Sequence, residues 1–400
     1  MRRPSVISLF TGAGGLDYGL EAAGFDIRVA VEMDHQSCET LRANRDWPVI
    51  EDSIFKVPTG HILKRAKLRH CQADILAGGP PCQPFSKSSY WVRGHALRLS
   101  DHRARTLNAF MRVAAEALPR VIFLENVEGF AYAGRDEGLQ FVLDELKRIN
   151  SRHGTNYVAS EAAVQCATYG VPQTRIRRIL VASREGVAFQ FPQPTHGAAA
   201  QPFRTAWDAL GDAEPEEDGL ELKGQWADLL PSVPEGKNYL WHTNRGGGLP
   251  IFGWRRRYWT FLLKLAKSRP SWTIQAQPGP SAGPFHWNNR RLSISELCRF
   301  QTFPTDVVIL GGRTAAHMQV GNAVPSLLTE VVGRAIRTQL LGLSACPGPL
   351  RLLPKVRLPI PRRTARREVP SKYMSLVGNH RDHPGEGKGP GARERASAAA

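Results

Sequence analysis

The sequence predicts an α/β protein with an open sheet covered by helices and a second, smaller domain. Over the first 183 residues, short apolar runs typical of buried strands alternate with amphipathic stretches, as expected for a sheet with helices on its faces. From residue 184 this alternation fades, and Pro, Gly and Trp become frequent. The 400 residues, 42% of them hydrophobic, are enough for one large domain or two.

The formal charge of +17 indicates a polyanionic partner, and nucleic acid is favoured over an acidic membrane surface. No run of eighteen apolar residues occurs, and the N-terminus lacks the apolar core of a signal peptide. We therefore expect a soluble, cytoplasmic protein that does not cross a membrane. The six cysteines are scattered without a CxxC pair, so neither a disulfide framework nor a metal site is expected.

The first strand, expected at residues 6–10, is followed by a glycine-rich turn at 11–15 and a helix at 16–23. A strand, a glycine turn and a helix bring backbone amides up to a ligand. The spacing is not GxGxxG, because Asp17 stands where the third glycine would be. This argues against a pyrophosphate-binding site, and therefore against a nicotinamide oxidoreductase. A nucleoside ligand without pyrophosphate remains compatible, and a plain tight turn is the alternative.

The second strand, at residues 25–31, ends at Glu32, about twenty residues after the glycines. An acidic residue there binds ribose hydroxyls in doubly wound folds, whereas the alternative is a solvated surface carboxylate. Asp52 and Ser53 close a third unit. They are expected either to hydrogen-bond an adenine amino group or to cap a turn.

A further strand at residues 73–77 leads into the sequence GGPPCQPFS at 78–86. Its prolines stiffen the backbone and hold Cys82 just beyond the strand end, which favours a nucleophilic thiol. The alternative is a stiff turn that happens to carry a cysteine. The polar, basic stretch at 86–105 is expected to be either a lid or a solvated loop.

After a helix at residues 106–118, a buried strand at 121–124 ends in Glu125, which is expected at the ligand-binding edge of the sheet. A helix at 139–149 and a strand at 157–164 follow. If the segment at 173–181 is extended, Arg175 and Arg177 share one face, where two guanidinium groups suit a carboxylate or phosphate. Two surface arginines on an edge strand are the alternative.

The region at 184–272 contains the cluster WRRRYW at 254–259, which suits nucleic-acid contact. Alternatively, its tryptophans form a small core with solvated arginines. A capped helix is expected at 291–304, because Ser293 and Glu296 have capping-box spacing, and a last helix at 326–341. From residue 345 the chain is expected to be a disordered basic tail, which either adds non-specific DNA affinity or has no role.

In this order, the stretches resemble the motifs of the DNA (cytosine-5) methyltransferase family over roughly residues 5–341. The resemblance is carried by the glycine turn, Gly79-Pro80-Pro81-Cys82-Gln83, Glu125-Asn126-Val127, Gln173-x-Arg175-x-Arg177, 291–304, and Gly321-Asn322-Ala323-Val324. It implies a Rossmann-like class I S-adenosylmethionine-dependent methyltransferase sheet with a smaller target-recognition domain. The implied division is 1–183 catalytic and cofactor-binding, 184–290 target recognition, 291–344 motifs returning to the catalytic domain, and 345–400 the tail.

By the same resemblance, Cys82 is the nucleophile that adds to carbon 6 of cytosine. Glu125, with a raised pKa, would hold or deliver the proton that the ring nitrogen N3 gains. Arg175 would fix the carbonyl oxygen of the base and the catalytic carboxylate, and Arg177 would support the loop. S-adenosylmethionine is the implied cofactor. Its implied contacts are Phe10, Thr11, Gly12, Gly14, Gly15, Leu16, Glu32, Met33, Asp52, Ser53, Gly79, Pro81, Asn322, Ala323 and Val324. Expected DNA contacts are Ser86, Lys87, Arg93, Arg103, Arg255, Arg256 and Arg257.

The implied substrate is double-stranded DNA with the target cytosine flipped out of the helix. A monomeric, nucleoid-associated prokaryotic modification enzyme is expected, whose product blocks a cognate restriction endonuclease. The alternatives are a relative that methylates cytosine in RNA and a DNA-binding relative that has lost catalysis. The Trp- and Arg-bearing region at 184–290 favours DNA, and the intact Cys82, Glu125 and Arg175 favour an enzyme.

Overall fold

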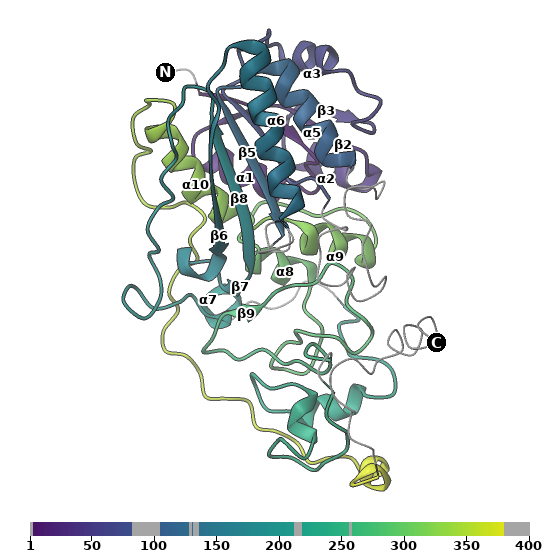
Figure 1. Cartoon of the computed structure of the whole chain (residues 1–400). Coiled ribbons are helices and arrows are strands. Elements are labelled where there is room, and N and C mark those ends of the chain that lie inside the picture. The colour runs from purple at the N-terminus through teal and green to yellow at the C-terminus, as the bar shows by residue number, and fades with distance from the viewer. Residues whose placement is uncertain are drawn as a thin grey trace, which may run out of the picture.

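The structure, a computed structural model, describes residues 3–81, 105–127, 130, 136–211, 218–255 and 258–379. Within these residues, seven strands form one sheet in the order β3-β2-β1-β4-β5-β8-β6 (Figure 1). Their bounds are β1 Ser5–Leu9, β2 Asp26–Glu32, β3 Val49–Glu51, β4 Ile75–Gly78, β5 Val121–Val127, β6 Val158–Gln165 and β8 Ile176–Ser183. A separate pair joins β7 Gln173–Thr174 to β9 Ser271–Trp272.

Strands β1 to β5 run parallel, and β8 is antiparallel to both β5 and β6. The carboxyl ends of β1, β2, β4 and β5 therefore meet at one edge of the sheet, the lower edge in Figure 1. Polar residues that follow these strands in sequence are brought together there, which is where ligands bind in open α/β sheets.

Alternate residues of β1 face opposite layers of helices, so both faces of the sheet are buried. Ile7 packs in a cluster with Ile62, Phe110 and other residues of the helices on one face, whereas Val6 packs with Leu20 and other residues of the second layer. The first layer holds α3 Thr59–Ala66, α5 Arg105–Ala117 and α6 Glu137–His153, and the second holds α1 Gly15–Ala22 and α10 Ser326–Gln339. Helix α2 is His35–Asn44.

Helices α1 and α10 approach most closely at Gly19. A Cβ at this position would lie 1.8 Å from the hydroxyl oxygen of Thr329 and 2.2 Å from the carbonyl oxygen of Ser326. We expect Gly19→Ala to lower the free energy of unfolding by about 1–3 kcal/mol, because the two helices must separate. Urea denaturation measures the effect. The control is Gly60→Ala, at an exposed position of α3, where the new Cβ meets nothing within 4 Å. A stability equal to or above wild type is expected for this variant.

Most predicted elements are confirmed within a few residues, including the helix at 326–341 and the capping box of Ser293 and Glu296 on α8 Ile294–Phe300. The segment at 173–181 is not one continuous strand, so the condition for a shared face of Arg175 and Arg177 is not met. The chain leaves β7 after Thr174, and β8 begins at Ile176 in a different sheet. Helix α9, Arg313–Asn322, was not predicted, because its sequence has no clear apolar stripe.

Below the sheet lies a lobe of short elements with its own hydrophobic cluster, which includes Leu229, Tyr239, Phe285 and Tyr373 (Figure 1). Its regular elements are the short 3-10 turns η4 Ala227–Ser232 and η5 Tyr239–His242. Helix α7 Ala206–Leu210 packs instead with Leu297 and Phe300 of α8, and η3 Cys166–Tyr169 lies beside the sheet. A second cluster joins Trp287 to Leu297 and Phe300, across the predicted boundary at 290. The domain limits therefore stay a prediction. None of the described helices combines the length and apolar character needed to cross a bilayer.

The predicted disorder from residue 345 is wrong for residues 345–379. This segment leaves α10, crosses to the lower lobe and ends in η6, Ser371–Leu376 (Figure 1). Tyr373 is 3% exposed and belongs to the core of the lobe. The composition is rich in Pro and Arg, which suggests a solvated chain, but buried carboxylates elsewhere in the protein hold its main chain, as described below.

Candidate active site

The glycine turn and the end of β2 are joined by the carboxylate of Glu32. One oxygen accepts a hydrogen bond from the amide of Gly12 at 2.8 Å, and the other accepts from the amides of Met33 and Asp34 at 2.8 and 2.9 Å. Phe10 has a φ of 55°, a left-handed conformation that a non-glycine residue adopts only when its surroundings enforce it. Glu32 thus fixes both loops at the carboxyl edge of β1 and β2.

The last predicted motif packs on this turn, although it lies some 300 residues away in sequence. The backbone of Gly15 lies directly against the carbonyl of Val324 and the side chain of Ala323, and the hydroxyl of Ser326 donates to the carbonyl of Gly15 at 2.7 Å. Asn322, at the end of α9, is exposed beside them. The structure therefore brings together the two ends of the candidate cofactor site.

The remaining candidate cofactor residues lie along the same edge. The amide of Asp52 donates to the carbonyl of Glu32 at 3.0 Å, and Asp52 accepts from the amide of Ser53 at 2.7 Å. Met33 is 70% exposed, whereas Thr11 and Leu16 are buried behind the turn. Carboxylates that can accept hydrogen bonds from hydroxyl and amino groups, with exposed apolar surface beside them, fit a nucleoside.

Glu125 lies at the end of β5, buried and 8% exposed. Its carboxylate forms an ion pair with Arg177 of β8, with 2.6 Å between Oε1 and Nε. The two residues meet because β5 and β8 are antiparallel neighbours. Burial raises the pKa of Glu125 above its ordinary value, and the positive charges of Arg177 and Arg175 oppose this rise only in part. A buried carboxyl group with a raised pKa is a candidate for proton transfer.

The segment that leads to Cys82 rests on Glu125. A Cβ at Gly79 would lie 2.8 Å from Oε2 of Glu125, so this close approach requires glycine. The side-chain amide of Asn126 donates to the carbonyl of Pro80 at 3.5 Å. Pro81 is the last described residue before Cys82, and Cys82 itself lies outside the described residues.

The positions of the two arginines correct the roles that the resemblance implied. Arg177, not Arg175, pairs with Glu125. Arg175 is 2% exposed, and its guanidinium donates to the carbonyls of Ile274 at 3.1 Å and Gly321 at 2.9 Å. Among the described contacts, the two guanidinium groups have different hydrogen-bond and ion-pair partners, because the strand is interrupted between them. Arg175 instead ties the lower lobe and α9 to the sheet.

Sequence reasoning did not identify two glutamines whose hydrogen bonds add to this connection between α9, the 274 region and the sheet. The side chain of Gln173 accepts from the amide of Ile274 at 3.0 Å and donates to Gln301 at 3.1 Å. Gln301 in turn donates to the carbonyls of Val320 at 2.7 Å and Ala323 at 3.1 Å. Both glutamines are fully buried. Gln173 and Gln301 lie within two of the motifs that carry the family resemblance, and this was the only sequence feature that could have identified them.

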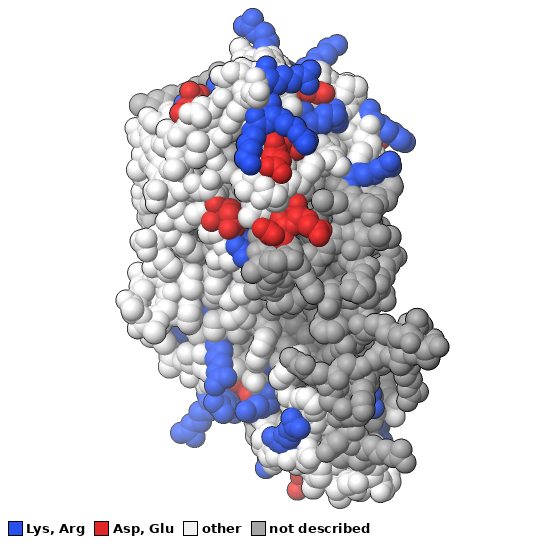
Figure 2. All heavy atoms as spheres, in the orientation of Figure 1, with Lys and Arg blue, Asp and Glu red and all other residues white. Residues whose placement is uncertain are grey.

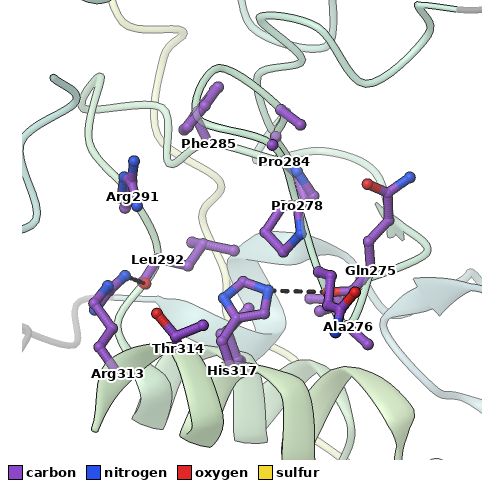
Figure 3. Close-up of a pocket in the computed structure, with 16 residues that line it drawn as sticks. Gln275, Ala276, Pro278, Pro284, Phe285, Arg291, Leu292, Arg313, Thr314 and His317 are labelled. Carbon is purple, nitrogen blue, oxygen red and sulfur yellow. Dashed lines mark hydrogen bonds between the residues drawn. The ribbon is translucent and has the colours of Figure 1, made fainter. Parts of the chain in front are cut away.

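A cavity of about 350 Å³ lies beside Ile274, between the 274–292 stretch and α9 (Figure 3). His317 of α9 points across it and is hydrogen-bonded through Nε2 to the carbonyl of Gln275 at 2.9 Å (Figure 3). Burial lowers the pKa of His317, and Arg313 and Arg291 lower it further. Among the described residues, no group of three or more metal-binding side chains occurs.

Of the predicted DNA contacts, only Arg255 lies within the described residues. Its amide donates to the hydroxyl of Tyr239 at 2.9 Å, in the lower lobe. Its guanidinium lies 5.9 Å from the ring centre of Tyr258, which is half exposed. Ser86, Lys87, Arg93, Arg103, Arg256 and Arg257 lie outside the described residues.

Comparison with known proteins places this arrangement in a family. The model of the family described as C-5 cytosine-specific DNA methylase matches residues 5–338. The Type II methyltransferase M.SacI of Streptomyces achromogenes is 38% identical over 369 residues, which cover 84% of this chain and 93% of that protein. M.AquIA of Picosynechococcus is 39% identical over 225 residues, covering 52% and 89%.

Solved structures agree in fold. A prophage-encoded protein of E. coli, described as a DNA modification methyltransferase, superposes with a TM-score of 0.60 at 20% identity, covering 84% of this chain and 99% of that one. DNMT2 of Spodoptera frugiperda gives 0.57 at 15% identity, covering 82% and 97%. The predicted Rossmann-like methyltransferase sheet is thereby confirmed. The chain belongs to the C-5 cytosine-specific DNA methylase family and is a DNA (cytosine-5-)-methyltransferase.

Proposed function

We propose that this protein transfers a methyl group from S-adenosylmethionine to carbon 5 of a cytosine flipped out of a specific short duplex sequence. The observation that carries the proposal is the buried Glu125, paired with Arg177 and in contact with the segment that leads to Cys82. The names of the relatives, Type II methyltransferases, support a role in modification alongside a restriction endonuclease that cuts the same site.

Cys82 acts as the nucleophile because carbon 5 of cytosine is itself unreactive. Its thiolate sulfur bonds to carbon 6, and the π electrons of the carbon 5–carbon 6 bond make carbon 5 nucleophilic. After carbon 5 accepts the methyl group, it loses its proton to a base, and the sulfur–carbon 6 bond breaks. Covalent catalysis thus divides one difficult step into two easier ones.

Glu125 holds the proton that N3 of the ring needs while the thiolate adds. Burial raises the pKa of Glu125, which favours the acid form more than in an ordinary glutamate, and the contact with Arg177 fixes the direction of the carboxyl group. Arg175 has a positioning role, because its hydrogen bonds to the carbonyls of Ile274 and Gly321 hold these two segments against the end of the sheet.

S-adenosylmethionine supplies the methyl group as a sulfonium donor. Glu32 suits its ribose hydroxyls, Asp52 suits its adenine amino group, and Phe10 and Met33 provide apolar contact. The turn at 11–15, with Asn322, Ala323 and Val324, suits the remainder of the molecule. The broken GxGxxG spacing is consistent with this ligand, which has no pyrophosphate.

We expect Glu32→Gln to weaken S-adenosylmethionine binding by about tenfold to a hundredfold, because hydrogen bonds to a charged group are worth roughly 1.5–3 kcal/mol. Isothermal titration calorimetry with S-adenosylmethionine measures the change. Glu51→Gln is the matched control: Glu51 ends the neighbouring strand β3 but is paired with Arg42 and His35. Equal affinities for both variants would contradict the assignment of Glu32.

Extrusion of the cytosine costs a few kcal/mol, which is recovered in the pocket that receives it. The lower lobe is suited to reading the sequence in the major groove, where each good bidentate contact discriminates by about 1–3 kcal/mol. The segment at 86–105, of which residues 86–104 lie outside the described residues, is proposed as the lid, and the enzyme is proposed to act as a monomer.

Transfer of labelled methyl groups to duplex DNA, compared with transfer RNA, tests the substrate. We expect methylation of DNA alone, and methylation of RNA alone would overturn the proposal. Bisulfite sequencing of DNA from cells that express the protein then gives the target sequence. A single short motif methylated at one cytosine is the expected result.

A further inference from the structure

Residues 345–379, here called the C-terminal strap, lie beyond the part of the chain that the family model matches. The strap nevertheless runs along the body of the protein from α10 to the lower lobe (Figure 1). Near its start, Leu350, Leu352 and Leu353 pack against the cluster that contains α1 and α10. It therefore connects the two parts of the molecule through specific contacts.

Buried carboxylates hold the main chain of the strap. Glu330 of α10 is fully buried and accepts hydrogen bonds from the amides of Arg351 and Leu352 at 2.8 and 2.9 Å. Further along, Asp208 of α7 accepts from the amide of Arg357 at 2.8 Å. These contacts fix the backbone without engaging the positive charges of most strap side chains.

The same pattern continues into the lower lobe. Glu235 is buried, accepts from the amide of Thr364 at 2.6 Å and also binds the ammonium group of Lys267. At the end of the strap, Tyr373 stacks on Trp226 with 5.5 Å between ring centres and 18° between ring planes. The strap is therefore anchored at both ends and at two points between them.

This anchoring leaves a concentrated positive charge at the surface. Between residues 351 and 372 the sequence has eight Lys or Arg and one Glu. Arg362, Arg363 and Arg367 are exposed, and within the described ranges no carboxylate forms an ion pair with their side chains. They span five residue steps, at most about 17 Å of chain, which matches several base pairs of duplex. On the face shown in Figure 2, Lys and Arg gather on the lower lobe along the path of the strap, where Asp and Glu are sparse.

We propose that the C-terminal strap is a DNA-binding surface that contacts backbone phosphates outside the target sequence. Guanidinium groups on a fixed backbone match the charge and geometry of phosphates, and such contacts carry affinity without reading sequence. The proposal rests on duplex DNA as the substrate. It adds a contact surface outside the catalytic motifs and the predicted recognition region.

The salt dependence of DNA binding tests the proposal. The variant Arg362→Gln/Arg363→Gln/Arg367→Gln removes three charges but keeps every main-chain hydrogen bond of the strap. Each phosphate contact contributes about 0.9 to the slope of log K against log salt concentration, so we expect the slope to become shallower by about 2 to 3. Fluorescence anisotropy with a random-sequence duplex several helical turns long measures it for the full chain.

The matched control is Lys64→Gln/Arg65→Gln/Arg69→Gln, which removes three exposed charges on and next to α3, at the far end of the molecule (Figure 1). We expect the wild-type slope for this variant. Equal slopes for the strap variant and wild type would overturn the proposal, as would equal losses in both variants, which would reflect net charge alone. Wild-type protein that binds no duplex DNA would instead overturn the proposed substrate. Thermal melting confirms that both variants are folded.

Discussion

Cys82→Ser is expected to abolish methylation, with a loss of roughly 10⁴-fold or more in turnover. A serine hydroxyl has a far higher pKa than a thiol and is not ionised near neutral pH, so it cannot add to carbon 6 of the ring. Cofactor binding should stay intact, because Glu32 and the glycine turn lie on other strands. Labelled methyl transfer and calorimetry with S-adenosylmethionine measure the two properties separately.

A mechanism-based trap makes this experiment specific. DNA that contains 5-fluorocytosine at the target should form a lasting protein–DNA adduct, since a fluorine at carbon 5 cannot leave as a proton. Peptide mapping is expected to locate the adduct at Cys82. Cys71→Ser is the matched control, because Cys71 is an exposed free cysteine outside the site, and its adduct should form as in wild type. An adduct elsewhere, or undiminished turnover of Cys82→Ser, would refute the covalent mechanism.

The sequence was most informative where function depends on strand ends. Glu32 and Glu125 each follow an apolar run, and parallel strands bring such residues to one edge whatever the details of the helices. The same argument accounts for the hydrogen bond from the amide of Gly12 to Glu32, because β1 and β2 are parallel neighbours. Local alternation of apolar and polar residues was sufficient for this part of the fold.

The pairing of the arginines could not be predicted in the same way. Arg175 and Arg177 are equivalent by alternation, and only the change of sheet between β7 and β8 separates them. That change depends on Ser271, which is about a hundred residues away and pairs with Gln173. A long-range contact therefore decides which guanidinium reaches Glu125.

For the C-terminal strap, amino-acid composition gave the wrong prediction. Its sequence favours disorder, because it is rich in Pro and Arg. The groups that order it, Glu330, Asp208 and Glu235, lie in three distant elements and accept hydrogen bonds from its main chain. Hydrogen bonds to the main chain leave no trace in the side chains of the recognised segment, so the local sequence could not reveal this part of the anchoring.

Glu125→Gln is expected to lower kcat by about 10²–10⁴-fold, the usual range for loss of a general acid or base. Glutamine keeps the size of the side chain and a donor for N3, but it has no proton to transfer. Single-turnover methylation of a target duplex measures the chemical step directly. The matched control is Glu161→Gln, on the neighbouring strand β6, where Glu161 pairs with Arg178 at a more exposed position. Wild-type turnover is expected for the control.

The pH profile distinguishes proton transfer from a structural effect at Glu125. Burial raises the pKa of this carboxyl group, so its acid form persists to higher pH than that of an ordinary glutamate. If the acid form serves N3, wild-type kcat falls as pH increases through the raised pKa, while the increasing thiolate fraction of Cys82 acts in the opposite direction. The falling limb should disappear in Glu125→Gln, which does not titrate. A variant that is slower but keeps the wild-type limb would show that Glu125 supports the site without exchanging the proton.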